Sequence, residues 1–302
     1  MKNCLYALLF AGLLASCGGS KQAVSTAPAP VVVIEEKVII NDTPNTAPEV
    51  ETDIMETPES PEQTNQTPPV VEIDEPTMDE SAIEEPFGEA FDHKSFNTLL
   101  VNYVSPKGNV NYPEFKKQWS TLRSYIAALG ENMPTEAWTK NDKFAYWMNA
   151  YNAMTIDLIL RNHPLTSIKK INDPWDQRLW KLGSKWYNLD EIEHQILRKM
   201  GDPRIHFGIN CASFSCPPLL NEAFTAETVD AQLEKLAIQF INDSKRNTIT
   251  TNSIEVSKIF NWFSKDFKTD GSLIDFLNKY SETPISPNAK TRYMDYDWTL
   301  NN

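Results

Sequence analysis

The sequence lacks several features that would identify a common class of protein. It has four cysteines and four histidines in 302 residues. No Cys-x-x-Cys or His-Glu-x-x-His pattern occurs among them, so the usual zinc-site spacings are missing. No apolar run reaches the roughly 20 residues that a membrane-spanning helix requires. No internal repeat is present. These absences argue against a zinc-ribbon protein, an integral membrane protein and a repeat protein.

The N-terminus has the pattern of an exported lipoprotein. Lys2 gives a short positive start, and residues 5–14 form an apolar run with the length of a signal-peptide core. The run ends in Leu14-Ala15-Ser16-Cys17, which resembles the bacterial lipobox, whose cysteine is lipidated. We expect residues 1–16 to be a removed signal peptide and Cys17 to attach the chain to a membrane. The expected location is the cell envelope, on the outer membrane facing the periplasm. The alternative is an ordinary secretory signal.

Residues 18–88 contain few aromatic or basic residues. Phe87 is the one aromatic residue of this stretch, and Lys21 and Lys37 are its basic residues, against sixteen acidic residues and ten of the twenty prolines. Such a composition cannot bury enough apolar area to offset the entropy of the chain. We therefore predict that residues 17–88 are the lipidated cysteine followed by a disordered, acidic, proline-rich tether.

The acidity of the chain belongs to this tether. The formal net charge is −13, from 28 basic and 41 acidic residues. Removing the tether's residues and Lys2 leaves residues 89–302 with 25 residues of each sign and no net charge. Because a nucleic-acid surface needs a basic excess, we expect no nucleic-acid partner. The membrane, through the lipid on Cys17, is an expected partner, and the sequence does not identify a substrate or a protein partner.

Residues 89–302 hold all eight tryptophans and are long enough for one sizeable core. Apolar spacing and capping residues predict helices over 91–104, 113–130, 141–162, 190–201, 225–241, 259–267 and 272–280. Asp190 is the expected cap of the fourth. Turn residues predict hairpins over 179–189 and 247–256, and alternation predicts strands over 204–210 and 292–298. The predicted fold class is α+β, a single mainly helical domain with a small antiparallel sheet. The order of His206 before Cys216 in the chain is compatible with a permuted papain-like arrangement.

Chemistry-bearing residues concentrate between Glu193 and Cys216. Pro217 and Pro218 follow Cys216 and can open a helix, whose dipole would favour a thiolate at its N-terminus. In this interpretation Cys216 is the nucleophile, and backbone N–H groups after it bind the oxyanion. His206 on its predicted strand is the base, ahead of His194. Glu193, Asn149 or Asn152 orients the base.

Two alternatives stay open for the same residues. An exported protein lives where thiols oxidise, so Cys211 and Cys216 could form a disulfide that leaves no nucleophile. His206 and the two cysteines, with His194 or Glu193, are also acceptable zinc ligands. Their spacing does not match known zinc motifs, so we expect no metal. We expect no cofactor either.

Further polar residues could contact a ligand. Asn149 and Asn152 share one face of an aromatic helix that also holds Trp147, where they could bind a peptide. Such amides also commonly bond buried backbone. Arg204 could clamp a carboxylate, and a local salt bridge is its alternative.

Several longer motifs occur together in this part of the chain. They are Phe144–Ala153, Glu191–Arg198, Asp202–Phe207, Cys211–Pro217, Ser257–Phe263 and Tyr296–Asn301. Their combination over nearly all of residues 93–302 resembles the domain-of-unknown-function 547 family, which implies no settled activity. The resemblance adds weight to the residues that stand in its motifs, namely Asn149, Asn152, Glu193, Arg198, Arg204, His206, Cys211 and Cys216.

The sequence thus leads to two hypotheses. The first is a membrane-anchored, thiol-dependent hydrolase or acyltransferase that acts on an amide, such as a cell-envelope peptide. Its catalytic residues would be Cys216, His206, Glu193 and Asn149, and its binding residues would be Asn152, Arg204, Arg198, Trp147 and His194. The second is a non-catalytic binding module with a structural Cys211–Cys216 disulfide.

Overall fold

The computed structural model describes residues 90–302. The predicted signal peptide, Cys17 and the tether lie outside the described residues. The α-helices are α1 (Lys94–Tyr103), α2 (Tyr112–Phe115), α3 (Trp119–Glu131), α4 (Lys140–Asn162), α5 (Leu189–Glu191), α6 (Ile205–Gly208), α7 (Val229–Ile241), α8 (Ile259–Trp262) and α9 (Leu273–Asn278). A π-helix, η3 (Ile192–Leu197), continues α5. The 3₁₀ turns are η1 (Lys116–Gln118), η2 (Ile168–Lys170), η4 (Arg198–Met200) and η5 (Asp266–Lys268).

Five short strands complete the domain. β1 (Trp180–Leu182) and β2 (Lys185–Tyr187) form an antiparallel hairpin. β3 (Thr248–Ile249) pairs antiparallel with β4 (Ser253–Val256), and β4 pairs parallel with β5 (Lys290–Tyr293). The prediction of a mainly helical domain is therefore confirmed. The predicted single antiparallel sheet is not observed. The structure has two small sheets, and the larger one is mixed.

Helix α4 is the centre of the domain. Every residue from Phe144 to Leu160 is buried, because other elements surround the helix on all sides. Thr139 and Asp142 form a capping box at its N-terminus, which satisfies two backbone N–H groups. The helix thus begins one residue before the predicted start. No helix within residues 90–302 is long and apolar enough to cross a membrane.

Asp157 is a charged residue in the middle of this core. Its carboxylate accepts hydrogen bonds from the indole N–H groups of Trp119 and Trp180, at 2.6 and 2.7 Å, and from the Arg161 guanidinium at 2.7 Å. A buried charge is costly unless it is paired and hydrogen-bonded. Asp157 therefore ties α3 and β1 to the central helix.

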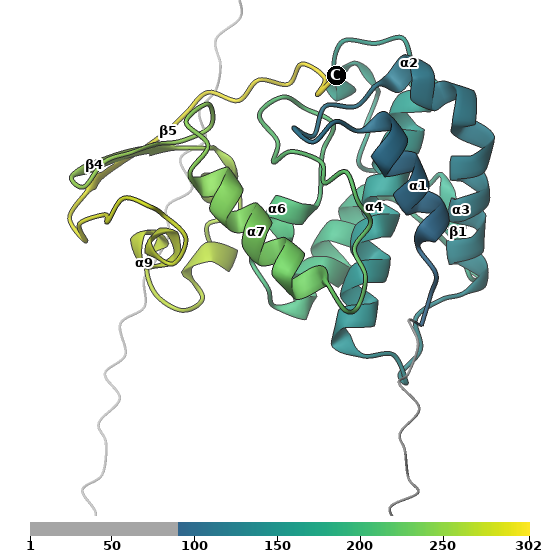
Figure 1. The fold of residues 1–302 in the computed structure, drawn as a ribbon, viewed down its shortest axis with the longest axis horizontal. Coiled ribbons are helices and arrows are strands. Elements are labelled where there is room, and N and C mark those ends of the chain that lie inside the picture. The colour runs from purple at the N-terminus through teal and green to yellow at the C-terminus, as the bar shows by residue number, and fades with distance from the viewer. Residues whose placement is uncertain (1–89) are drawn as a thin grey trace, which may run out of the picture. The chain divides into compact units, whose positions relative to one another are not determined.

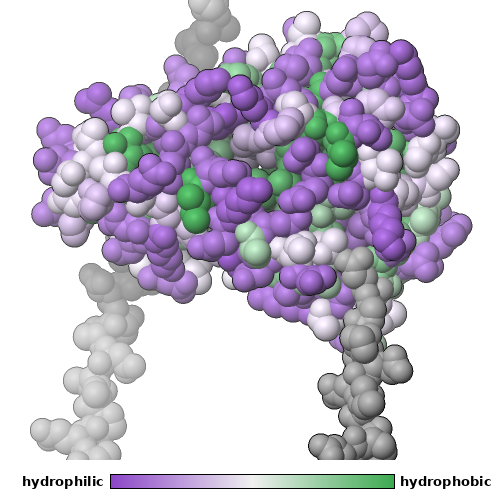
Figure 2. Space-filling model, viewed as in Figure 1, coloured by the Kyte–Doolittle hydropathy of each residue, from purple (hydrophilic) through white to green (hydrophobic). Residues whose placement is uncertain are grey.

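The other elements flank this centre. Figure 1 shows α1, α2 and α3 on one side, the β4–β5 sheet and α9 on the other, and α6 and α7 between them. The face drawn in Figure 2 is mostly hydrophilic, with apolar residues in small separate spots. The apolar residues are mainly in the interior, as expected for a domain with a continuous core.

The strand predicted over 204–210 is wrong. Residues Ile205–Gly208 form the short helix α6, and all four are buried, so no exposed face alternates with a buried one. The Asp202 carboxylate accepts a hydrogen bond from the Arg204 backbone N–H at 2.9 Å and starts this turn. Gly208 lies where α6 approaches α4, and a Cβ there would displace the end of the Met148 side chain.

Two boundaries also differ from prediction. The side chain of Asn188, two residues before the predicted cap Asp190, accepts from the Glu191 N–H at 2.8 Å and caps α5. Strand β5 covers residues 290–293, the Met294 N–H still donates to the Val256 carbonyl of β4 at 2.9 Å, and residues 295–298 leave the sheet. The tail is thus free to run back across the domain toward α2 (Figure 1).

Candidate active site

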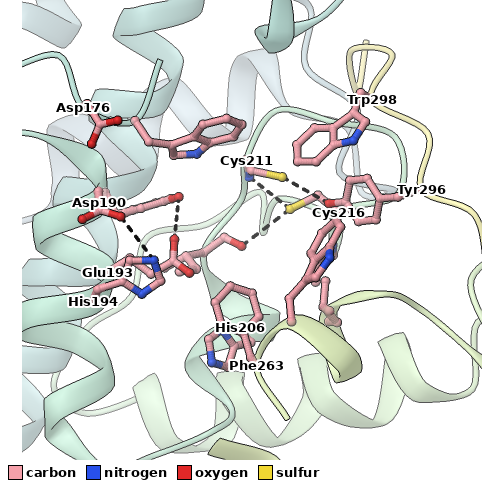
Figure 3. A pocket seen from close by; sticks show the side chains of 16 residues that line it. Asp176, Asp190, Glu193, His194, His206, Cys211, Cys216, Phe263, Tyr296 and Trp298 are labelled. Atoms are coloured by element: carbon pink, nitrogen blue, oxygen red, sulfur yellow. Dashed lines mark hydrogen bonds and ion pairs between the residues drawn. The ribbon is translucent and has the colours of Figure 1, made fainter. Parts of the chain in front are cut away.

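A cavity of about 340 Å³ lies among the predicted site residues. The π-helix supplies Glu193 and His194, and α6 supplies His206. Cys211 and Cys216 come from the irregular segment that follows α6. Figure 3 shows Asp176, Asp190, Glu193 and His194 on one side, with the two cysteines, Tyr296 and Trp298 on the other. The aromatic side chains in the lining are Tyr151, Trp175, Trp262, Phe263, Tyr296 and Trp298.

The cysteine segment has no regular secondary structure, so side-chain amides hold it. Asn210 donates to the Pro217 carbonyl at 2.7 Å and accepts from the Ala212 N–H at 2.8 Å. Asn152 of α4 accepts from the Asn210 N–H at 2.9 Å. Asn301 donates to the Asn210 side chain at 3.2 Å. Hence the core helix and the C-terminal tail both fix the segment, and the two thiols have defined positions.

The backbone at Ala212 is in a sparsely populated conformation. Its φ is 56°, which is uncommon for a residue other than glycine. This turn brings the Cys211 sulfur within 3.1 Å of the Ser213 hydroxyl, and the Tyr296 hydroxyl lies 3.2 Å from the same sulfur. The strained backbone at Ala212 is thus part of the turn that places two hydroxyl groups beside the Cys211 sulfur.

The two cysteines are both free thiols and are not equivalent. Hydrogen bonds from Cys216, Ser213 and Tyr296 stabilise the Cys211 thiolate and lower its pKa, although burial opposes this. Burial, and the proximity of Cys211, raise the pKa of Cys216 well above its usual value. The Cys216 sulfur also accepts the Cys211 N–H at 3.0 Å. Cys211 is therefore the thiol that ionises first.

Glu193 is the second unusual titrating group. Its side chain is on the π-helix and is only 8% exposed. Burial raises its pKa to about 7, while the Tyr151 hydroxyl, which donates to Oε2 at 3.1 Å, works in the opposite direction. π-Turns are frequent at functional sites. Near neutral pH, Glu193 can both give and take a proton.

His206 belongs to a separate ion network at the edge of the cavity. Its Nε2 lies 2.7 Å from Asp266, and its ring stacks on Phe263 at a centroid distance of 4.0 Å. Arg198 binds both oxygens of Asp266 at 2.7 Å and also contacts His194 Nδ1 at 2.9 Å. Burial lowers the pKa of His206 despite Asp266, so the imidazole is neutral over most of the physiological range.

The structure departs from the predicted Cys216 mechanism in three respects. Residues 217–228 form no helix, so no helix dipole favours the Cys216 thiolate. Pro217 and Pro218 have no backbone N–H, so neither can bind an oxyanion. Within the described part of the chain, His206 makes no hydrogen bond to either sulfur. The Cys211–Cys216 disulfide is not formed in the structure.

Four other predicted residues lie outside the cavity lining. Asn149 bonds the backbone N–H and carbonyl of Phe224, at 3.0 and 2.8 Å. Asn152 anchors α6 and the cysteine segment through Gly208 and Asn210. Trp147 packs against Tyr146 and Tyr187 in the core. The guanidinium of Arg204 binds three carboxylates, those of Asp202, Asp230 and Glu234.

Sequence reasoning missed most of the aromatic wall. Trp262, Tyr296 and Trp298 stood in motifs of the resemblance, and no role was predicted for them. Tyr296 and Trp298 pack at 4.6 Å between ring centroids, and Trp262 contacts both rings. The high density of aromatic residues in the C-terminal tail could have indicated their role in the cavity. The alternating pattern of the tail instead led to the prediction of a strand. Within residues 90–302, no group of three metal-ligand side chains is arranged to hold a metal ion.

Comparison with known proteins gives one result. No curated protein and no solved structure matches the chain. A family model, described as "Protein of unknown function, DUF547", matches residues 135–241, less than half of the chain. This range includes Glu193, His206, Cys211 and Cys216 but not the C-terminal tail. Residues 135–241 of this chain are therefore a DUF547 domain.

Proposed function

We propose that the domain is a thiol-dependent hydrolase or acyltransferase that acts on an amide, with Cys211 as its nucleophile. The supporting observation is that a thiol with two hydroxyl groups within hydrogen-bond distance and a carboxyl group with a pKa near neutral line one cavity. Thiolates are the nucleophilic form of cysteine, and perturbed titrating groups concentrate at functional sites. The sequence-based proposal thus moves from Cys216 to Cys211.

Each group has a definite task in this reaction. The Cys211 thiolate attacks the amide carbonyl carbon, and a C–S bond forms as the carbonyl π electrons move to oxygen. The Tyr296 hydroxyl, which accepts from Ser213, can turn its proton from the sulfur to this oxyanion once the sulfur has lost its charge. Glu193 gives its proton to the leaving amine nitrogen, and the C–N bond breaks. The product is a thioester on Cys211 and a free amine.

The second half of the reaction uses the same carboxylate. Ionised Glu193 takes a proton from water, whose oxygen attacks the thioester carbonyl, and the C–S bond breaks to restore the thiolate. If a second amine replaces water, the result is acyl transfer. Cys216 takes no part in bond formation in this scheme; its sulfur accepts the Cys211 backbone N–H at 3.0 Å. Lipid attachment at Cys17 would place the reaction in the cell envelope.

Acylation by p-nitrophenyl acetate tests the nucleophile. We expect a burst of p-nitrophenolate and an acetyl group on Cys211, identified by peptide mass spectrometry of the full chain, which also separates any label on Cys4 or Cys17. Cys211→Ser should abolish the burst, and Cys216→Ala should retain it with a slower rate at neutral pH. Acetylation of Cys216, or a burst that survives Cys211→Ser, would overturn the assignment.

The role of Glu193 has its own readout. Nitrophenolate needs no proton to leave, so Glu193→Gln should keep the burst but slow the turnover that follows it at least tenfold, within the range for general acid–base catalysis. Glu255→Gln on β4 is the matched control, because this carboxylate is exposed and outside the cavity. Unchanged turnover in Glu193→Gln would remove the carboxyl group from the mechanism.

A further inference from the structure

The charged groups that line the cavity are mainly acidic. Three carboxylates face it, those of Asp176, Asp190 and Glu193, and the lining contains no lysine or arginine. Asp176 and Asp190 are held on the same side, because the Asp190 N–H donates to the Trp175 carbonyl at 3.1 Å. Asn188 fixes the same corner by donating to the Asp176 carbonyl at 3.2 Å. An anionic ligand would meet these carboxylates without a permanent counter-charge in the lining.

The basic groups near the lining do not reverse this bias. His194 is paired with Asp190 at 3.3 Å, and His206 is held neutral over most of the physiological range by burial. Arg198 is bound by both oxygens of Asp266. Lys169 is outside the lining, at 5.5 Å from the ring centroid of Trp175 and 5.3 Å from that of Trp298.

An aromatic wall adjoins these carboxylates in the cavity. Trp298 contacts Trp175 at 5.7 Å, Trp262 at 5.8 Å and Tyr296 at 4.6 Å between ring centroids, so four rings form a continuous wall. Aromatic faces attract ammonium groups. Lys169 lies over Trp175 and Trp298 from outside the lining, so these two rings already have one ammonium neighbour.

Glu193 presents one carboxyl oxygen to the cavity. The residue is more than nine-tenths buried, and the Tyr151 hydroxyl donates to its Oε2. The side chain lines the cavity, and Oε1 is not among the fully enclosed side-chain atoms of residues 90–302 that lack a partner. Oε1 is therefore accessible to a ligand that donates a hydrogen bond.

We propose that the substrate carries a positively charged amine, which binds between the carboxylates of Asp176 and Asp190 and the wall of Trp175 and Trp298. The scissile carbonyl would then be presented to Cys211. The inference rests on the proposed function for the identity of the reacting sulfur. It names the substrate class as an amide compound with a free ammonium group, such as a peptide with an unblocked amine.

Charged thiosulfonate reagents test the proposed preference for a positively charged substrate. This test does not require the substrate to be known. The Cys211 thiolate attacks the sulfenyl sulfur of a methanethiosulfonate, an S–S bond forms, and methanesulfinate leaves. The probes are the cationic 2-(trimethylammonio)ethyl and the anionic 2-sulfonatoethyl reagents. Each rate at Cys211 is measured on the full chain by peptide mass spectrometry and divided by the rate for N-acetylcysteine amide. Because the thiolate fraction is common to both reagents, the ratio of the two rates does not depend on the pKa of Cys211.

We expect the cationic reagent to be favoured roughly tenfold over the anionic one, as for one or two carboxylates within several ångströms at an intermediate dielectric. Asp176→Asn should reduce this preference severalfold, and the double variant with Asp190→Asn should nearly remove it. Glu136→Gln, which alters an exposed carboxylate outside the lining, should leave it unchanged. A ratio equal to that of the free thiol, or one that Asp176→Asn does not change, would overturn the substrate class.

This outcome is separable from the fate of the proposed function. If Cys211 is acetylated by the ester but shows no preference for the cation, the hydrolase proposal stands and the substrate class fails. If the preference is present but the ester leaves no acetyl group, the cavity is an amine-binding site without acyl chemistry. Trp298→Leu adds a check on the aromatic wall, because it should lower the rate of the cationic reagent more than that of the anionic one.

Discussion

Replacing Glu193 with glutamine should make the protein more stable at neutral pH. The wild-type carboxyl group is buried on the π-helix, with Tyr151 as its hydrogen-bond donor and with Cys211, Arg198 and Asp190 as its charged or titrating neighbours. Glutamine has nearly the same shape and can still accept from the Tyr151 hydroxyl. It cannot ionise, so the cost of burying a charge disappears.

The size of the effect follows from proton linkage. The pKa of Glu193 is raised from 4.5 to about 7, and each unit of pKa corresponds to about 1.4 kcal/mol, which gives about 3 kcal/mol. Between pH 4.5 and 7 the folded protein holds this proton more tightly than the unfolded chain. The wild-type free energy of unfolding therefore loses this amount as pH rises through that interval. The loss is complete above about pH 7.

Urea unfolding followed by tryptophan fluorescence measures this pH-dependent contribution of Glu193 to the free energy of unfolding. The quantity to plot is the unfolding free energy of Glu193→Gln minus that of the wild type, from pH 4.5 to 8. All other groups titrate in both proteins, so their contributions largely cancel. The difference should rise toward about 3 kcal/mol, while Glu255→Gln should give a flat line. A flat line for Glu193→Gln would refute the raised pKa and with it the acid–base role.

Three further outcomes are expected. Tyr296→Phe removes one hydroxyl donor from the Cys211 sulfur but keeps the ring, so the pH midpoint of iodoacetamide labelling at Cys211 should move upward; an unmoved midpoint would contradict the hydrogen bond. Asp157→Asn leaves two indole N–H groups and a guanidinium poorly paired in the core, and the unfolding free energy should fall by about 3 kcal/mol in urea titration. Burial lowers the pKa of His93 from 6.5 to about 4, so wild-type stability should gain a contribution between pH 4 and 6.5 that is lost on acidification. The variant His93→Gln should lack that dependence, as pH-resolved unfolding would reveal.

The helical core could be predicted because its signals are local. The apolar run of α4 and the turn at Gly183 determine nearby structure through caps, spacing and positive φ, and the structure has both where expected. The segment over 204–210 failed because short buried helices and short buried strands share the same apolar composition. In this case the Asp202 side chain decides between them.

The site could be predicted only in part, because its geometry depends on distant contacts. Cys211 and Tyr296 are 85 residues apart in sequence, and their contact selects which thiol is acidic. From sequence, the prolines after Cys216 favoured the other cysteine. Composition cannot distinguish two cysteines five residues apart, since their pKa values depend on which neighbours donate and which accept.

The amides of the central helix explain how an irregular segment can hold a reactive thiol in place. Asn152 bonds Gly208 and Asn210, and Asn210 in turn bonds Ala212 and Pro217. Each bond replaces a backbone pairing that a strand or helix would have supplied. A regular element at this point would place successive side chains on fixed faces. An amide-held turn places the Cys211 sulfur beside the hydroxyls of Ser213 and Tyr296. The buried asparagines are thus positioning residues, and the chemistry we propose belongs to the thiol that their chain of hydrogen bonds holds in the cavity.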